Sequence, residues 1–289
     1  MSSESLVADG PAAPSPVAAG GFTLSARPES PAMLLRRLWG SRELIAVLAR
    51  REFFVRFKRA SLGVLWAVGV PALQAGVMVV VFSRIVRVDT AVPYITFVFA
   101  GMTVWSFFAS ALATASTAIV DGLGLASKIY FPRAVLPLVS VGASVYGLGI
   151  SLGILAVVEL ADTRHIGAEI LLVIPAAGLL VALAAGFGLL NSALHVYLRD
   201  VRFLVQAALL VWIYVTPVFY PVNLVHGSLR GLILANPLTG IVEVFRAATV
   251  GADTAVLPAV AISAAWSVGL IVAGLLVQSR FDRLFTDLL

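Results

Sequence analysis

The sequence predicts an all-α membrane protein with six transmembrane helices, and two observations support this fold class. Of the 289 residues, 60% are hydrophobic and only 12% are charged, whereas soluble domains average about 45–50% and about 25%. Several apolar runs also reach the roughly 20 residues that a helix needs to cross the bilayer core. Both observations argue against a water-soluble protein and for a chain embedded in a membrane.

The first 62 residues change composition once. Residues 1–31 are rich in Ala, Pro, Ser and Gly and lack the basic start and apolar core of a signal peptide, which predicts a disordered cytoplasmic tail. Residues 32–62 are rich in arginine and large apolar residues instead. In their second half, apolar positions recur at helical spacing and basic residues occupy the other side. We expect an amphipathic interface helix that lies on the membrane surface.

Residues 63–289 form the predicted transmembrane domain. Its apolar runs place the six spans at residues 63–83, 94–120, 134–160, 169–194, 204–220 and 256–278. Basic residues favour the cytoplasmic side of a membrane. With both termini placed in the cytoplasm, fifteen of the 20 Lys and Arg residues fall on that side and five fall outside. The charge distribution therefore predicts that both termini are cytoplasmic.

The connection between the fifth and sixth spans, residues 221–255, is too long and too apolar for a simple external loop. Two helical pieces are expected in it, at residues 229–234 and 238–250, with a break at Asn236 and Pro237. Each piece is well short of a span. We therefore expect short re-entrant helices at the outer face, before the last span.

The sequence contains few residues that could take part in catalysis or ion coupling. The acids nearest to the predicted spans, Glu159 and Glu169, lie at span ends, whereas functional acids are usually buried inside spans. The stretch 122–129 lacks the second glycine and the Ser or Thr of a phosphate-binding loop. His195 and Asp200 have the spacing of an acyltransferase base and acid, without the rest of such a site. We therefore expect no catalytic residue, no metal site and no bound cofactor in this chain.

Two further classes are disfavoured by composition. The chain contains no cysteine, so disulfides and thiolate metal or redox sites are excluded. The net charge of +5 reflects basic residues that cluster next to the spans and form no recognisable nucleic-acid module. Nucleic-acid binding is therefore not expected.

Two short loops that are predicted on the inner side mix aromatic and basic side chains. Their candidate residues are Lys128, Ile129, Tyr130, Phe131 and Arg133 in the first loop, and Arg199, Asp200 and Arg202 in the second. Aromatic and arginine side chains are the usual anchors of protein interfaces. They also mark the lipid boundary, where tyrosine occupies the aromatic belt and arginine sets the topology. The residues alone leave both interpretations open.

The order of motifs along the chain resembles a known family. The stretch REFFVRFKRASLGVLW (residues 51–66) is followed by SKIYFPRAVLPL after the second span and LRDVRFL after the fourth. TPVFYP then ends the fifth span, and NPLTGIVEVFR precedes the sixth. This order, over roughly residues 41–289, is similar to the type 2 ABC-transporter permeases. It is most similar to their polysaccharide-export branch, which includes O-antigen, teichoic-acid and galactan exporters.

The resemblance implies a multi-pass protein of the bacterial plasma (inner) membrane. It implies a homodimer with two copies of a separate ATPase subunit, which would hold ATP and magnesium and would dock on the two inner loops as coupling elements. The implied substrate is a polysaccharide on a polyprenyl-pyrophosphate carrier, moved from the cytoplasmic side outward. The alternatives are a drug or lipid cargo for the same kind of permease, or an integral-membrane transferase that acts on lipid-linked glycan.

Three groups of residues would serve this substrate. Because the guanidinium fork matches phosphate, we assign the lipid pyrophosphate to Arg51, Arg56 and Arg59. Because sugar rings can slide along aromatic faces, the glycan path is assigned to Phe97, Trp105, Phe108, Tyr146, Trp212, Tyr214, Phe219 and Tyr220. The resemblance assigns an outer gate to Asn236, Pro237, Glu243 and Arg246. Glu243 and Arg246 are three residues apart on one helix face, so simple pairing between them is the second interpretation.

Overall fold

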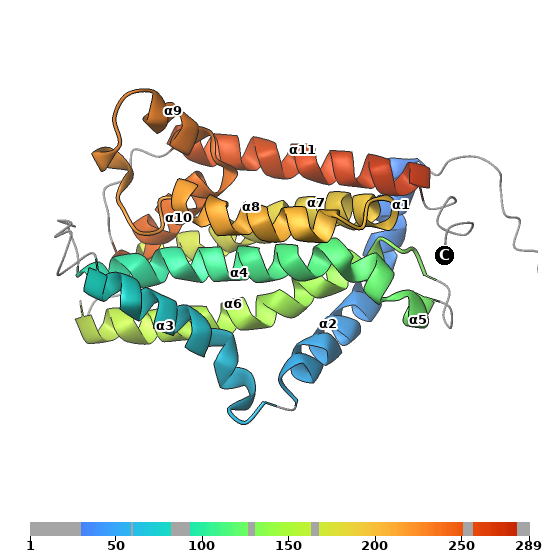
Figure 1. Ribbon diagram of the computed structural model, residues 1–289, viewed down its shortest axis with the longest axis horizontal. Helices are drawn as coiled ribbons and strands as arrows, with labels where there is room; N and C mark the ends of the chain where they lie inside the picture. The colour runs from blue at the N-terminus through green and yellow to red at the C-terminus, as the bar shows by residue number, and fades with distance from the viewer. Residues whose placement is uncertain are drawn as a thin grey trace, which may run out of the picture.

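The computed structural model describes residues 30–58, 60–81, 93–126, 131–162, 168–250 and 257–281, so nearly all of the predicted tail lies outside it. The described residues form helices and no strand (Figure 1). The α-helices are α1 (Pro31–Gly40), α2 (Arg42–Phe57), α3 (Trp66–Val80), α4 (Tyr94–Asp121), α5 (Leu123–Ala126), α6 (Val135–Asp162), α7 (Val173–Tyr197), α8 (Val201–Val215), α9 (Ser228–Ala235), α10 (Pro237–Val250) and α11 (Leu257–Phe281). Short 3-10 helices are η1 (Gly63–Leu65), η3 (Ala168–Leu172) and η4 (Val222–Leu224).

Five helical stretches are long and apolar enough to cross a membrane. They are Gly63–Val80, Tyr94–Asp121, Val135–Val158, Ile170–Tyr197 and Leu257–Arg280. These stretches confirm five of the six predicted spans, with ends that differ by a few residues. The two predicted short helices before the last span are also confirmed, because α9 and α10 meet at Asn236 with a bend of 81°.

The fifth predicted span, 204–220, is wrong as a continuous helix. α8 ends at Val215 after 15 residues, about 22 Å long, whereas the bilayer core is about 30 Å thick. Pro217 disfavours a helical conformation for the residue before it, and Thr216 is extended. Residues 216–220, here called the non-helical segment, continue the path with their first four residues buried. Such backbone is tolerated at membrane depth only where protein groups satisfy it.

The helix predicted within residues 32–62 is divided into α1 and α2 at Ser41, whose hydroxyl donates to the carbonyl of Arg37 at 3.0 Å. Ser30 caps α1 by accepting a hydrogen bond from the backbone N–H of Met33 at 3.3 Å. Leu38 is buried in a cluster that also contains residues of α2, α6, α7 and α11, whereas Phe54 on α2 is half exposed. One face of this pair therefore packs on the bundle, and its position on the membrane surface stays a prediction.

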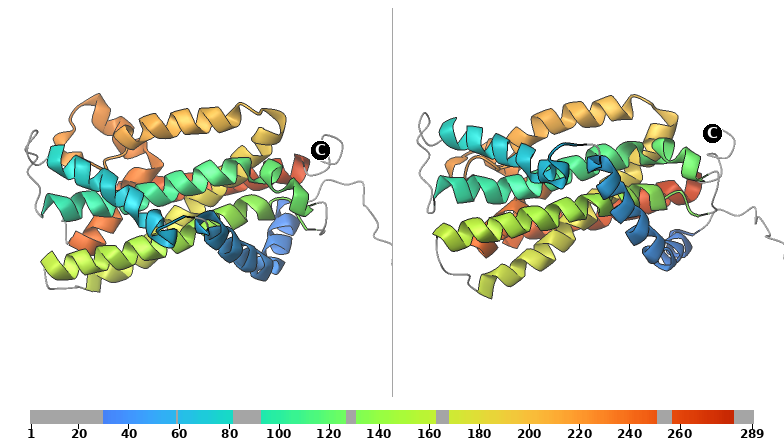
Figure 2. Two further views of the ribbon diagram at one scale, coloured as in Figure 1. Left: turned by 60° about the horizontal axis from the view of Figure 1, so that its bottom comes forward. Right: turned by 90° about the horizontal axis from the view of Figure 1, so that it is seen from below.

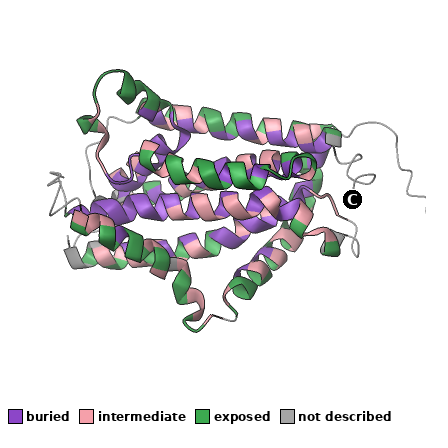
Figure 3. Ribbon diagram, in the orientation of Figure 1, coloured by how far each residue is buried: buried purple, intermediate pink, exposed green. Residues whose placement is uncertain are grey.

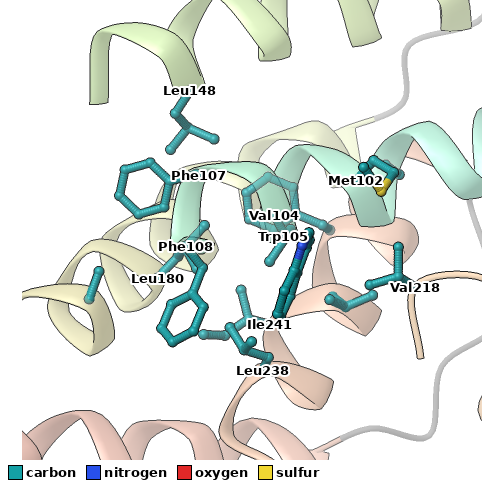
Figure 4. Close-up of a cluster of buried hydrophobic side chains, with 14 of the residues drawn as sticks. Met102, Val104, Trp105, Phe107, Phe108, Leu148, Leu180, Val218, Leu238 and Ile241 are labelled. Carbon is teal, nitrogen blue, oxygen red and sulfur yellow. The ribbon is translucent and has the colours of Figure 1, made fainter. Parts of the chain in front are cut away.

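α4 is the central helix of the bundle. Figure 2 shows it running between α6 and α8, and Figure 3 shows it largely buried while α3 and α8 are largely exposed. The core around it includes Trp105, Phe108, Leu180 and Ile241 (Figure 4). The exposed outer faces of α3 and α8 are thus the surfaces that remain for lipid or for another chain.

α7 and α11 cross at close range. A Cβ added at Gly186 would lie 2.7 Å from the Cβ of Leu270 and 2.8 Å from the backbone N of Ile271. Only glycine fits such a crossing, as is usual for closely packed membrane helices.

The two ends of the bundle differ. α1, α2, α5 and the end of α11 lie at one end, here called the α2 end, and α9 and α10 lie at the other, the α10 end (Figure 1). The first and last described helices therefore reach the same end of the bundle. Its assignment to the cytoplasm rests on the charge distribution and stays a prediction.

Candidate functional site

A polar cavity of about 800 Å³ opens among α2, α4, α6 and α8 at the α2 end. Three arginines line it: Arg51 and Arg56 on α2, and Arg202 in the first turn of α8. We call it the arginine cavity. Two of its arginines were assigned to phosphate and the third to an inner loop, and the fold brings them together. The third predicted phosphate residue, Arg59, lies outside the described residues.

The three guanidinium groups differ in their partners. Arg56 donates through Nη1 to the hydroxyl of Ser110 at 3.1 Å and through Nη2 to Glu52 at 3.5 Å. Arg51 and Arg202 have no hydrogen bond or ion pair with any residue that the structure describes. An unpaired guanidinium keeps five N–H donors. Two of the three arginines are therefore free to bind an anion.

Two acids share the cavity with the arginines. Besides its contact with Arg56, Glu52 accepts a hydrogen bond from Ser140 at 3.3 Å. Asp121 accepts one from Thr117 at 2.6 Å. Three arginines against two acids leave the lining with one positive charge. In the described part of the chain, no group of His, Asp or Glu could hold a metal ion. The donor set therefore suits a phosphate-like anion.

The residues predicted to couple to an ATPase lie at the same end. Three of them, Lys128, Ile129 and Tyr130, are outside the described residues. Phe131 and Arg133 are partly buried, and Phe131 packs on the cluster that holds α1 and α2 against α6. Arg199 and Asp200 are exposed between α7 and α8. An interface role for these loops stays a prediction.

A second cavity, of about 750 Å³, runs between α3 and α8 over α4. We call it the α3–α8 groove. Of the eight aromatic residues that were assigned to a glycan path, it contains Trp105, Tyr214 and Phe219. Gln206 lines both this groove and the arginine cavity. The apolar groove and the cationic cavity are therefore neighbours that share this side chain.

The other five aromatic residues occupy packing positions. Phe108 is fully buried and meets the ring of Trp212 edge to face at 5.3 Å. Tyr146 stacks on Phe53 at 5.4 Å. Tyr220 donates its hydroxyl to the carbonyl of Tyr214 at 3.0 Å. Phe97 lies under Arg246, with its ring centroid 3.5 Å from Cζ. The groove thus contains three of the eight aromatic residues, and the other five contact neighbouring groups of the protein.

Arg246 on α10 anchors the non-helical segment at the α10 end. Its side chain is 1% exposed, and Nη2 donates to the carbonyl of Val218 at 2.8 Å. Nη1 donates to Glu243 at 2.9 Å, which confirms the predicted pairing of these two residues. Tyr94 on α4 donates to the carbonyl of Phe219 at 2.6 Å. Side chains of α10 and α4 therefore donate hydrogen bonds to two backbone carbonyls of the non-helical segment.

Asn236 joins the end of α8 to the start of α10. Its Oδ1 accepts from Trp212 Nε1 at 3.1 Å and from the N–H of Leu238 at 3.0 Å, and its Nδ2 donates to Thr216 Oγ1 at 3.0 Å. Pro237 follows at the first position of α10, where a missing N–H is not costly. We call the contacts of Tyr94, Asn236 and Arg246 to the end of α8 and to the non-helical segment the clasp. A gating role for the clasp stays a prediction.

Sequence reasoning missed Gln74 on α3 and Gln206 on α8. Both amides are exposed on helices that are otherwise apolar, and an amide without a hydrogen-bond partner is costly in lipid. Their isolation within apolar runs was the signal that could have found them.

A cationic cavity, an adjoining aromatic groove and a clasped break in one helix, all within a bundle of membrane-spanning helices, are features of a transport subunit. Residues 43–250 match the ABC-2 type transporter family, and the chain belongs to that family. It is 30% identical over 221 residues to the O-antigen export system permease protein RfbA of Myxococcus xanthus, covering 74% of this chain and 83% of that protein. The protein of the same name from Klebsiella pneumoniae is 26% identical over 208 residues, with 71% and 79% covered.

These matches confirm the resemblance to type 2 ABC permeases of the polysaccharide-export branch. Together with the apolar helices, they indicate a multi-pass protein of the inner membrane.

Proposed function

We propose that this chain is the transmembrane subunit of an ABC exporter that moves a polyprenyl-pyrophosphate-linked polysaccharide from the cytoplasmic side outward. Two copies of the chain form the pore, and two copies of a separate ATPase subunit supply the energy. The relatives named as O-antigen export permeases support this cargo class. The observation that carries the proposal is that the arginine cavity and the aromatic groove are neighbours that share Gln206 in their linings.

The arginine cavity fits the pyrophosphate. Arg51 and Arg202 approach it from α2 and α8 with unpaired guanidinium groups, and Arg56 adds a third that is shared with Glu52. Two arginines from different helices can each hold a phosphate group through two parallel hydrogen bonds. Arg59, three residues after Arg56 in the sequence, is proposed to extend the site.

The α3–α8 groove fits a neutral sugar polymer. Trp105, Tyr214 and Phe219 offer rings without fixed charge. In one copy of the chain the groove is open, and its rim is formed by exposed apolar residues such as Leu73 and Leu210. A second copy packed against this face would enclose the path, which supports the homodimer. The clasp is then the outer gate, and the inner loops are the coupling elements.

The function is tested with the chain and its ATPase purified together in lipid nanodiscs, with added polyprenyl pyrophosphate. We expect the lipid to stimulate ATP hydrolysis, and the double change Arg51→Ala and Arg202→Ala to abolish the stimulation while the complex stays intact. Arg230→Ala, an exposed arginine on α9 at the other end, is the matched control and should retain it. Stimulation of the double variant at the wild-type level would refute the phosphate assignment.

The alternative cargoes and the transferase predict other outcomes. A drug or lipid exporter would not respond to the pyrophosphate, and a transferase would convert lipid-linked glycan in the absence of the ATPase. Mass spectrometry of the lipid after incubation with the chain alone should show it unchanged.

A further inference from the structure

Two glutamines face the α3–α8 groove without protein partners. Gln74 on α3 and Gln206 on α8 both line it, and neither side chain has a hydrogen bond with any described residue. The third glutamine, Gln278, behaves differently: its Nε2 donates to the carbonyl of Leu189 at 3.0 Å and to Ser192 at 3.2 Å. Gln278 is thus buried with its amide nitrogen bonded, whereas the two groove amides are exposed and make no such bond.

The indole of Trp105 presents a third unused polar group in the same place. This residue is only 6% exposed, yet its N–H has no acceptor among the residues that the structure describes. A buried tryptophan usually finds a partner for its N–H. Because Trp105 lines the groove, its N–H is available to a molecule that occupies the groove.

Three cavities meet around these groups. Gln206 also lines the arginine cavity. Gln74 and Trp105 also line a smaller cavity of about 350 Å³, which includes Arg56 and Ser151. Ser151 is 4% exposed, and its hydroxyl likewise has no partner in the described chain. Unused donors and acceptors therefore lie among the residues that the three neighbouring cavities share.

We infer that Gln74, Gln206 and Trp105 form a recognition site for the sugar that is attached directly to the pyrophosphate. This inference rests on the proposed function and adds a ligand and a specificity role to it. Each amide offers two donors and one acceptor oxygen, which matches neighbouring sugar hydroxyls. The indole offers an apolar face for the ring and one N–H. The pyrophosphate in the arginine cavity would place its first sugar at these three side chains.

The test measures binding to the nanodisc-embedded complex with its ATPase. The probes are bare polyprenyl pyrophosphate and the same lipid carrying one glucose, one galactose or one N-acetylglucosamine. We expect wild type to bind one of the sugar-bearing lipids about tenfold more tightly than the bare lipid, as a few hydrogen bonds would provide. The single change Gln74→Leu, at a residue outside the arginine cavity, should reduce this ratio about threefold with the affinity for the bare lipid unchanged. The double change Gln74→Leu and Gln206→Leu should reduce the ratio to about one.

Trp105→Phe keeps an aromatic ring, removes the N–H, and should reduce the ratio about threefold. Equal binding of all four probes to wild type would overturn the sugar site, while stimulation by the bare lipid would leave the proposed function standing. Failure of wild type to bind any probe would overturn both. A full sugar preference in the double leucine variant would also refute the site. Dissociation of the homodimer in that variant would refute it too, because the amides would then be contacts between the two copies.

Discussion

Replacing Arg246 by methionine should release the non-helical segment from α10. The change removes the hydrogen bonds to Val218 and Glu243 and the contact with Phe97. An orphaned buried carbonyl costs about 1–3 kcal/mol, and breaking a buried ion pair costs about 3–5 kcal/mol. These costs overlap, since both include desolvated partners of one side chain. We therefore expect the free energy of unfolding to fall by about 3–5 kcal/mol.

The assay is equilibrium unfolding in mixed detergent micelles, with three variants compared. Arg246→Lys keeps the charge but lacks the guanidinium fork that bonds Val218 and Glu243 at once. Its free energy of unfolding should therefore fall by roughly half as much as that of Arg246→Met. The double change Arg246→Met and Glu243→Gln removes the unpaired acid and should be more stable than Arg246→Met alone. A loss below about 1 kcal/mol for Arg246→Met, or no recovery in the double variant, would refute the role of the clasp as a structural anchor.

Three further changes test other parts of the molecule. The first replaces residues of the first inner loop with alanine: Tyr130, Phe131 and Arg133. This triple variant should no longer co-purify with the ATPase, and recovery of an intact complex would count against the loop as the joint. Gly186→Ala should destabilise the α7–α11 crossing by about 1–3 kcal/mol, whereas Gly178→Ala, with nothing within 4 Å of an added Cβ, should be nearly neutral in the same unfolding assay. Tyr94→Phe should cost about 0.5–1.5 kcal/mol by removing the hydrogen bond to the carbonyl of Phe219, and an unchanged midpoint would contradict this contribution.

Local patterns in the sequence were sufficient for much of the fold. The length of apolar runs placed five spans, and Asn236 followed by Pro237 placed the break between α9 and α10. The spacing of Glu243 and Arg246 predicted their pairing. Each of these features is written in one continuous stretch of the chain, either an apolar run of about 20 residues or a spacing of a few residues, which is why the sequence displays them.

Other features depend on contacts between distant segments. The early end of α8 was missed because residues 216–220 remain apolar, so composition alone continues the span through Pro217. The meeting of Arg51 with Arg202 has no local signal, since the two residues approach from α2 and α8 and are joined only by the cavity. The loop assignment of Arg202 was drawn from its neighbours in sequence, and the structure adds its neighbours in space.

The clasp has a consequence for permeability. The carbonyls of Val218 and Phe219 are bonded by side chains, so any movement of this segment must supply them with new hydrogen-bond donors. Hydroxyl-rich cargo and the water that accompanies it carry such donors, and an empty apolar passage does not. Under the proposed function, in which the clasp is the outer gate, opening would therefore be most costly when nothing is being carried, and the idle protein would have a built-in barrier against leakage of ions.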